Sequence, residues 1–151
     1  MRTAMLTLAA CGLMVLPTAA DEPSKKGKDG VVREIDLKGF KTHTVLPKGD
    51  LPKGPVTKPT AIASAEELKK AISDKEWRER ILKQVDFAKE KLLFFAWSAS
   101  WADQLSFQVE KDKTPPTVVF SYSPGVDDDL RPHFRLFAIP KDASWRVEVK
   151  K

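Results

Sequence analysis

One apolar segment constrains the fold more than any other part of this chain. Residues 91–98 (KLLFFAWS) are almost all apolar, and polar and apolar positions do not alternate along them. A strand with one face in water alternates, so a run of this kind predicts a strand that is covered on both faces. The fold must therefore place residues 91–98 at the centre of a sheet.

Four further segments after this central run have strand patterns. Turn residues separate them, notably the prolines at 115–116, the Ser-Pro-Gly turn at 123–125, and Pro140. Short strands joined by compact loops predict an antiparallel sheet. The segments are 105–109, 117–123, 133–139 and 145–149, of which the first and last alternate as half-exposed strands do.

Two capping boxes predict the helical region that precedes the sheet. Ser64 with Glu67 begins one helix, and Ser73 with Glu76 begins the next. Apolar residues at spacings of three and four give these helices a buried face, formed by Leu68, Ala71 and Ile72 and by Trp77, Ile81, Leu82 and Val85. The predicted fold class is α+β, an antiparallel sheet (sandwich- or barrel-like) with a helical segment packed on one face.

The chain before residue 61 has a different composition from the rest. Residues 21–30 have no anchor for a core and are expected to be a disordered tether. Residues 31–60 are expected to be an extended segment, with Val31, Arg33, Ile35 and Leu37 on one side, and then a Pro/Gly/Lys-rich connector from 47 to 59. Residues 61–151 form the predicted α+β domain.

The first twenty residues have the pattern of an export signal. A positive start at Arg2 precedes an uncharged, apolar run from 3 to 16, then Pro17 and three small residues. This order predicts residues 1–20 as a signal peptide cleaved after Ala20. The run is too short to span a bilayer, which needs about 20 residues as a helix. The mature chain is therefore expected to be periplasmic or secreted, in a bacterium, without a transmembrane span.

A lipid anchor is the alternative interpretation of this segment. Leu8-Ala9-Ala10-Cys11 resembles the lipobox of bacterial lipoproteins, in which the cysteine is acylated. The apolar run continues past Cys11, whereas a lipoprotein usually turns polar there. Cys11 is the only cysteine, so cleavage after Ala20 would exclude a disulfide, a thiol nucleophile and a thiolate metal site.

Most of the net charge of +5 lies outside the predicted domain. Residues 21–60 carry nine Lys/Arg and six Asp/Glu, whereas residues 61–151 carry sixteen and fifteen. A nucleic-acid binder places a basic face on its folded part. The distribution therefore argues against nucleic acid as a partner.

Three sequence blocks carry a family resemblance. They are Ser-Ala-Glu-Glu-Leu (64–68), Val-Asp-Phe (85–87) before the apolar strand, and Arg-Pro-His-Phe-Arg-Leu-Phe-Ala-Ile-Pro-Lys (131–141). Over residues 61–149 the chain resembles small uncharacterised exported bacterial proteins, and more distantly the C-terminal domain of PrcB-type protease-complex subunits. That family usually carries a Thr-Gly-Gly-Tyr turn, where this chain has residues 98–102 (SASWA). The resemblance implies an accessory or interaction module and no enzyme.

The sequence gives little support for a catalytic site or a metal site. The acidic run Asp127, Asp128 and Asp129 offers oxygens at consecutive positions, whereas Ca²⁺ needs six to eight from spaced ones. The two histidines, His43 and His133, fall in different predicted elements. A hydrolase using His133 and the acidic loop is an alternative function, but no Gly-x-Ser-x-Gly elbow supports it. No catalytic residue, metal or cofactor is predicted.

The turn after the central strand is the predicted binding surface. Trp101 is placed there as an aromatic contact for a ligand, and Asp103, Arg131 and Arg135 as its polar rim. The functional hypothesis is a non-enzymatic binding or accessory module that binds a protein or another component of the cell envelope.

Overall fold

A computed structural model describes residues 31–41, 51–127 and 129–150. The predictions for the signal peptide, Ala20, Cys11, the tether and His43 lie outside these residues. No helix in the described ranges is long and apolar enough to cross a membrane.

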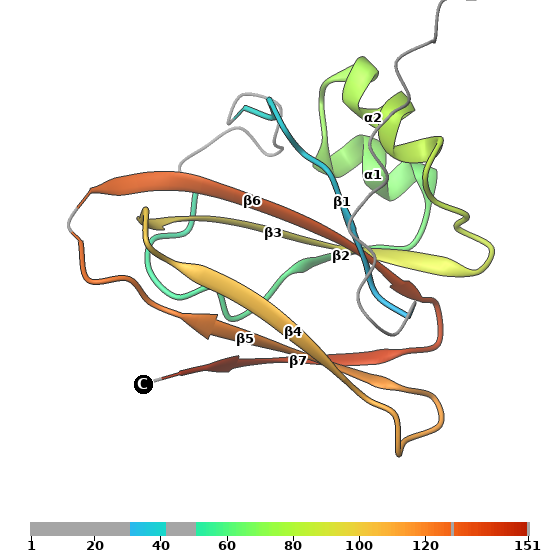
Figure 1. The fold of residues 1–151 in the computed structure, drawn as a ribbon. Helices are drawn as coiled ribbons and strands as arrows, with labels where there is room; N and C mark the ends of the chain where they lie inside the picture. Colours follow the sequence, from blue (N-terminus) through green and yellow to red (C-terminus); the bar gives the residue numbers. More distant parts are fainter. Residues whose placement is uncertain (1–30, 42–50, 128, 151) are drawn as a thin grey trace, which may run out of the picture.

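Two sheets and two short helices make up the described fold (Figure 1). The four-stranded sheet has the order β1-β6-β3-β2, and the three-stranded sheet has the order β4-β5-β7. All five strands predicted from residue 91 onward are confirmed. The elements are β1 (Arg33–Ile35), β2 (Thr60–Ile62), α1 (Ala65–Ala71), α2 (Lys75–Leu82), β3 (Glu90–Ser100), β4 (Gln104–Glu110), β5 (Thr117–Ser123), β6 (Leu130–Pro140) and β7 (Ser144–Val149).

The central strand β3 is covered on both faces, as its sequence predicts. Leu93, Phe95 and Trp97 face the three-stranded sheet and belong to the core between the two sheets. Leu92 and Phe94 point the other way, into a second core under the helices. Alternate residues of one strand thus fill two cores, which explains why residues 92–97 are all apolar.

The predicted α+β fold, with an antiparallel sheet that is sandwich- or barrel-like, is confirmed in part, because most strand pairs are antiparallel but one pair is not. The strands divide between two sheets that pack face to face without closing a barrel, and β7 runs parallel to β5. The chain leaves the three-stranded sheet after β5, because β6 pairs with β3 of the other sheet along eleven residues. When the chain returns as β7, it lies beside β5 in the same direction. Local alternation predicts strands but not which sheet they join.

The helices form a layer on the outer face of the four-stranded sheet. The first capping box is confirmed, since the Ser64 side chain accepts a hydrogen bond from the Glu67 backbone N–H at 3.2 Å. The second prediction is wrong by one residue, because Asp74, not Ser73, caps α2 through the Trp77 N–H. A carboxylate is the stronger acceptor at a helix N-terminus.

The predicted buried faces of the helices are confirmed with one exception. Leu68, Ala71 and Ile72 of the first helical segment are buried, and so is Ile81 of α2. Leu82 is the exception, because it is 40% exposed at the last position of α2. A spacing of one residue from Ile81 places it on a different side of the helix.

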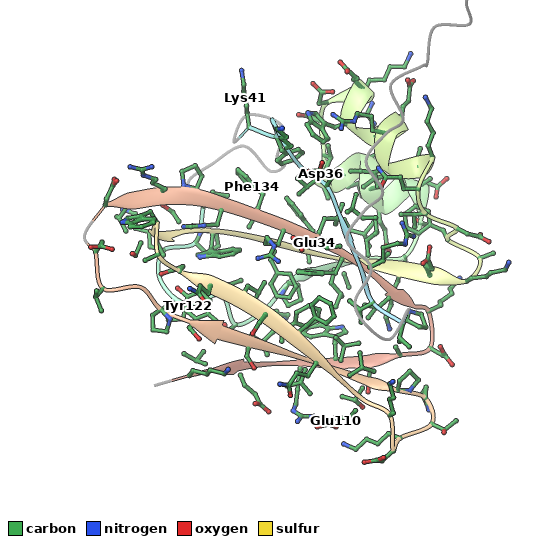
Figure 2. The ribbon with its side chains drawn as sticks, in the orientation of Figure 1. Glu34, Asp36, Lys41, Glu110, Tyr122 and Phe134 are labelled. Atoms are coloured by element: carbon green, nitrogen blue, oxygen red, sulfur yellow. The ribbon has the colours of Figure 1, made fainter. Side chains whose placement is uncertain are left out.

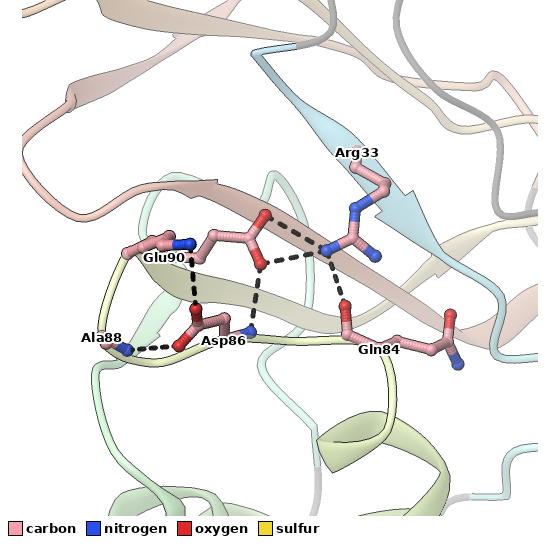
Figure 3. A network of polar contacts seen from close by, with 6 residues as sticks. Arg33, Gln84, Asp86, Ala88 and Glu90 are labelled. Atoms are coloured by element: carbon pink, nitrogen blue, oxygen red, sulfur yellow. Dashed lines mark hydrogen bonds and ion pairs between the residues drawn. The ribbon is translucent and has the colours of Figure 1, made fainter.

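Residues 31–35 complete the four-stranded sheet. β1 pairs with residues 136–138 of β6, and an Arg33 side-chain nitrogen donates to the Gln84 carbonyl at 2.7 Å and to Glu90 at 3.0 Å (Figure 3). The prediction that Val31, Ile35 and Leu37 share one side is wrong for Val31, which packs against the core between the sheets, whereas Ile35 and Leu37 pack in the core under the helices. Strand pairing and the ion pairs Arg33–Glu90 and Glu34–Arg135 therefore hold this segment against parts of the chain that follow much later.

Candidate functional site

Two loops meet at one end of the paired sheets, at the left in Figure 1. Residues 101–103 join β3 to β4, and residues 124–129, of which 128 is not described, join β5 to β6. β6 begins at Leu130, directly opposite Ser100 at the end of β3. The predicted binding surface falls in this region.

The Asp103 carboxylate joins both loops to the core. It accepts hydrogen bonds from the Trp97 indole N–H at 3.0 Å, from the Gly125 backbone N–H at 2.7 Å, and from the Tyr122 hydroxyl. Trp97 lies on β3, Tyr122 on β5 and Gly125 in the β5–β6 loop. One side chain thus fixes three elements relative to one another.

The hydrogen bonds to Asp103 change its acidity. Partial burial alone would raise the pKa of the Asp103 carboxyl, but the bonds from Tyr122, Gly125 and Trp97 and the nearby His133 lower it below its usual range. Burial and the adjacent carboxylate raise the pKa of the Tyr122 hydroxyl. Asp103 is therefore held as an anion and Tyr122 as a neutral donor.

The two loops pack too closely for a side chain at Gly125. A Cβ atom there would lie 2.8 Å from the Cβ of Ala102 and nearer still to the Ser100 hydroxyl oxygen. The same hydroxyl accepts the Ala102 backbone N–H at 3.2 Å. Glycine at 125 is thus required by contact between the loops.

His133 is the cross-strand neighbour of Trp97. Their rings stack with centroids 4.8 Å apart and an angle of 13° between the planes. The Nε2 atom of His133 lies 2.9 Å from the Ser100 carbonyl oxygen, which makes this nitrogen the N–H donor. Among the described residues the polar partner of His133 is thus a backbone carbonyl, as in a structural histidine.

Three large apolar side chains stand exposed on this fixed framework. Trp101 is 59% exposed, Val126 is 95% exposed and Leu130 is 56% exposed. Trp101 directly follows Ser100, and Val126 directly follows Gly125, at the point where the two loops are in contact. Leu130 is the first residue after the β5–β6 loop. We call Trp101, Val126 and Leu130 the loop surface.

The predicted polar rim is only partly assembled at this end. Arg131 lies there, opposite Ala99, and its Nε donates to Asp129 at 2.8 Å. Arg135 lies deeper, opposite Phe95, with one guanidinium nitrogen 2.9 Å from Glu34 of β1 and another 3.2 Å from the Leu105 carbonyl of β4. Its guanidinium carbon is 5.3 Å from the Phe137 ring centroid. Arg135 therefore joins the two sheets at the side where β1 and β4 face each other.

The candidate residues thus have different positions. Trp101, Asp103 and Arg131 lie at the same end of the sheets, with Trp101 exposed, Asp103 bonded inward to the core and Arg131 exposed beside Asp129. Val126 and Leu130 did not enter the sequence prediction. An apolar residue between Gly125 and an acidic run is a usable signal, because a loop of this kind is otherwise polar.

The described residues contain no group of three or more His, Cys, Asp or Glu side chains that could hold a metal ion. Asp128 of the acidic run is outside that search. Comparison with protein-family models, with curated proteins and with solved structures found no match to this chain.

Proposed function

We propose that this protein is an exported, non-enzymatic binding or accessory module of the bacterial cell envelope, and that it binds a protein or another envelope component through the loop surface. The observation that carries the proposal is the exposure of Trp101, Val126 and Leu130 on two loops that Asp103 fixes to the core.

Rigid loops favour binding because they have little conformational freedom left to lose. Ordering a side chain or loop on association costs free energy, and a framework already held by hydrogen bonds avoids most of that cost. Tryptophan is also the side chain that most often dominates an interface, because it buries a large area with few rotatable bonds. The Asp129–Arg131 pair supplies charges beside the apolar residues, as interface rims do.

The sequence resemblance supports the same role. Residues 61–149 resemble exported bacterial proteins and, more distantly, a PrcB-type domain, for which an accessory role is implied. Of the loop surface, Trp101 lies within residues 98–102 (SASWA), where this chain departs from the family's Thr-Gly-Gly-Tyr turn. A lipid anchor at Cys11 would alter how the protein is retained in the envelope and would leave this surface unchanged.

The contacts of His133 favour binding over hydrolysis. A catalytic base needs a free ring nitrogen within reach of a nucleophile's proton. Nε2 of His133 faces the Ser100 carbonyl, the ring is covered by Trp97, and among the described residues no nucleophile's hydroxyl is hydrogen-bonded to His133. These contacts use His133 to hold the end of β6 against β3.

The proposal predicts that truncating Trp101 abolishes partner capture without unfolding the protein. The full-length gene product, purified as the cell processes it, would be immobilised and exposed to a solubilised envelope fraction. Loss of a central aromatic contact typically costs at least about 2 kcal/mol, or roughly thirtyfold in affinity. The partner recovered by the parent protein should therefore be depleted at least about tenfold with Trp101→Ala, measured by quantitative mass spectrometry.

Leu82→Ala is the matched control for this experiment. Leu82 is also a large exposed apolar residue, but it lies on α2, away from the loop surface. It should retain the partner, and both variants should keep the parent melting temperature. Equal capture by Trp101→Ala and Leu82→Ala would reject the loop surface as the binding site.

A further inference from the structure

The outer edge of β7 offers backbone hydrogen-bonding groups that no other described strand uses. In Figure 1 this strand forms the lower edge of the three-stranded sheet. The Ser144 N–H bonds to the Pro116 carbonyl at 3.1 Å, and the Lys150 N–H bonds to the Tyr122 carbonyl at 2.8 Å. Successive residues of a strand direct their backbone groups to opposite edges, so even-numbered residues from 144 to 150 face β5. The N–H and C=O groups of Trp145, Val147 and Val149 therefore face outward.

The edges of three other strands, β4, β6 and β3, are better protected against strand addition. On β4, the Arg135 side chain donates a hydrogen bond to the Leu105 carbonyl. On β6, the exposed stretch beyond β1 contains Pro132, which has no N–H to donate. On β3, the Ser98 N–H and C=O bond to Pro52 and Gly54 of the connector. β7 has neither a proline nor, within the described chain, a side chain bonded to its outward groups.

The side chains of β7 are complementary to a second β7 strand in antiparallel orientation. Within one chain Arg146 donates to Glu148 at 2.9 Å and to Glu110 at 2.6 Å. A twofold axis at Val147 would place this pair opposite the same pair of the second copy, with Arg146 opposite Glu148 and Glu148 opposite Arg146. The outward backbone groups of 145, 147 and 149 would then meet in hydrogen-bonded pairs. Residues 146 and 148 would form the closer, non-hydrogen-bonded pairs, in which opposite charges attract most strongly.

The same register also covers an exposed apolar side chain. Val149 is 43% exposed, whereas Trp145 and Val147 pack against the core between the sheets. Across the twofold axis Val149 would lie opposite Trp145 of the second copy, on the core side of the sheet. Apolar pairs of this kind stabilise antiparallel strands.

From these observations we propose that the protein forms a homodimer through antiparallel pairing of β7 with β7 of a second copy, centred on Val147. The two three-stranded sheets become one continuous six-stranded sheet, and the loop surface plays no part in the contact. A closed twofold interface of this kind is isologous, since the same strand supplies both halves.

Charge variants test this register directly. The full-length gene product, purified as processed, would be examined by light scattering after size exclusion over a range of concentrations. Glu148→Lys sets Lys against Arg146 twice per dimer, and Arg146→Glu sets Glu against Glu148 twice. Each variant should raise the dimer dissociation constant by about tenfold or more. An equimolar mixture should restore the dimer as a heterodimer, because each strand then faces the opposite charges.

Hydrogen exchange supplies a readout that a merely structural role for these side chains would not change. The amides of Val147 and Val149 should gain protection as concentration rises, whereas those of Arg146 and Glu148 should be protected at every concentration. Val147→Pro removes an outward N–H without breaking a bond to β5 and should leave a folded monomer.

Three results would overturn the proposal. They are a monomer at all concentrations, a dimer that neither charge variant weakens, and variant dimers that mixing fails to restore. A variant that does not fold cannot be restored by mixing, so circular dichroism of each variant alone separates that case from loss of pairing.

Discussion

At the scale of single residues, Asp103 has the most connected role in the described structure. Its carboxylate receives donors from β3, β5 and the β5–β6 loop, and no other described side chain joins as many of the parts that present the loop surface. A short acidic side chain in a turn is ordinarily a solvated residue. Here it acts as the acceptor on which two buried donors, the Trp97 indole and the Tyr122 hydroxyl, depend.

Replacing Asp103 should destabilise the protein although it lies in a surface turn. Asp103→Asn keeps the shape but turns one acceptor oxygen into an amino group that faces a donor, and hydrogen bonds to a charged group contribute about 1.5–3 kcal/mol. Urea unfolding should show a loss of that size. Asp129→Asn is the control, because Asp129 pairs with the exposed Arg131 and its loss should change stability by less than about 0.5 kcal/mol. Equal effects in the two variants would contradict the role given to Asp103.

The free energy of unfolding is expected to depend on pH through Glu110, which lies at the opposite end of the three-stranded sheet from Tyr122 (Figure 2). The hydrogen bond from Arg146 and the ion pair with Lys113 lower the pKa of the Glu110 carboxyl from 4.5 to about 2. A carboxyl whose pKa is lower in the folded state stabilises the fold above its unfolded pKa. This contribution should be complete above pH 4.5 and should disappear as the pH falls toward 2.

The measurement is the difference in unfolding free energy between the parent and Glu110→Gln from pH 2 to pH 7. This free-energy difference should be constant above pH 4.5 and should decrease toward zero as the pH falls to 2. In a background carrying Arg146→Gln and Lys113→Gln, the same substitution should give no such closing difference, because the cations that lower the pKa are gone. A difference between the parent and Glu110→Gln that is still present at pH 2 would contradict the stabilising role of the Glu110 carboxylate.

At the scale of elements, β3 shows how one strand can support two cores. Phe95 is completely buried, with its ring centroid 4.8 Å from that of Phe120 and 5.8 Å from that of Phe137. Phe120 belongs to the three-stranded sheet and Phe137 to β6 of the other sheet. Phe95 therefore fills the space where the two sheets meet.

Phe95→Ala should lower the free energy of unfolding by about 3–5 kcal/mol, because it removes buried apolar area and leaves a cavity that the two sheets cannot close. Thermal or urea unfolding measures the loss. Val126→Ala, at a position that is 95% exposed, should change stability by less than about 0.5 kcal/mol. A loss below about 1 kcal/mol for Phe95→Ala would mean that β3 is not central to the packing.

At the scale of the whole molecule, the sequence predicts the elements better than their arrangement. The run 91–98 and the alternating segments identify every strand from β3 to β7, because burial on one or both faces leaves a local pattern. The division into two sheets and the parallel β5–β7 pair leave no such pattern, since either sheet can accept the same alternation. Similarly, Trp101 could be placed on a loop from its neighbours, whereas Val126 and Leu130 join it only through folding of the β5–β6 loop.

The pairing of β1 with β6 has a consequence for the order in which the chain can be assembled. Glu34 and Arg135 are in contact although 101 positions separate them in the sequence. Contacts between such distant positions form slowly, since a long loop must close before they bring any stabilisation. The four-stranded sheet therefore stays incomplete until residue 138 is available to pair with Arg33. A chain still in synthesis lacks this edge strand until residue 138 has emerged.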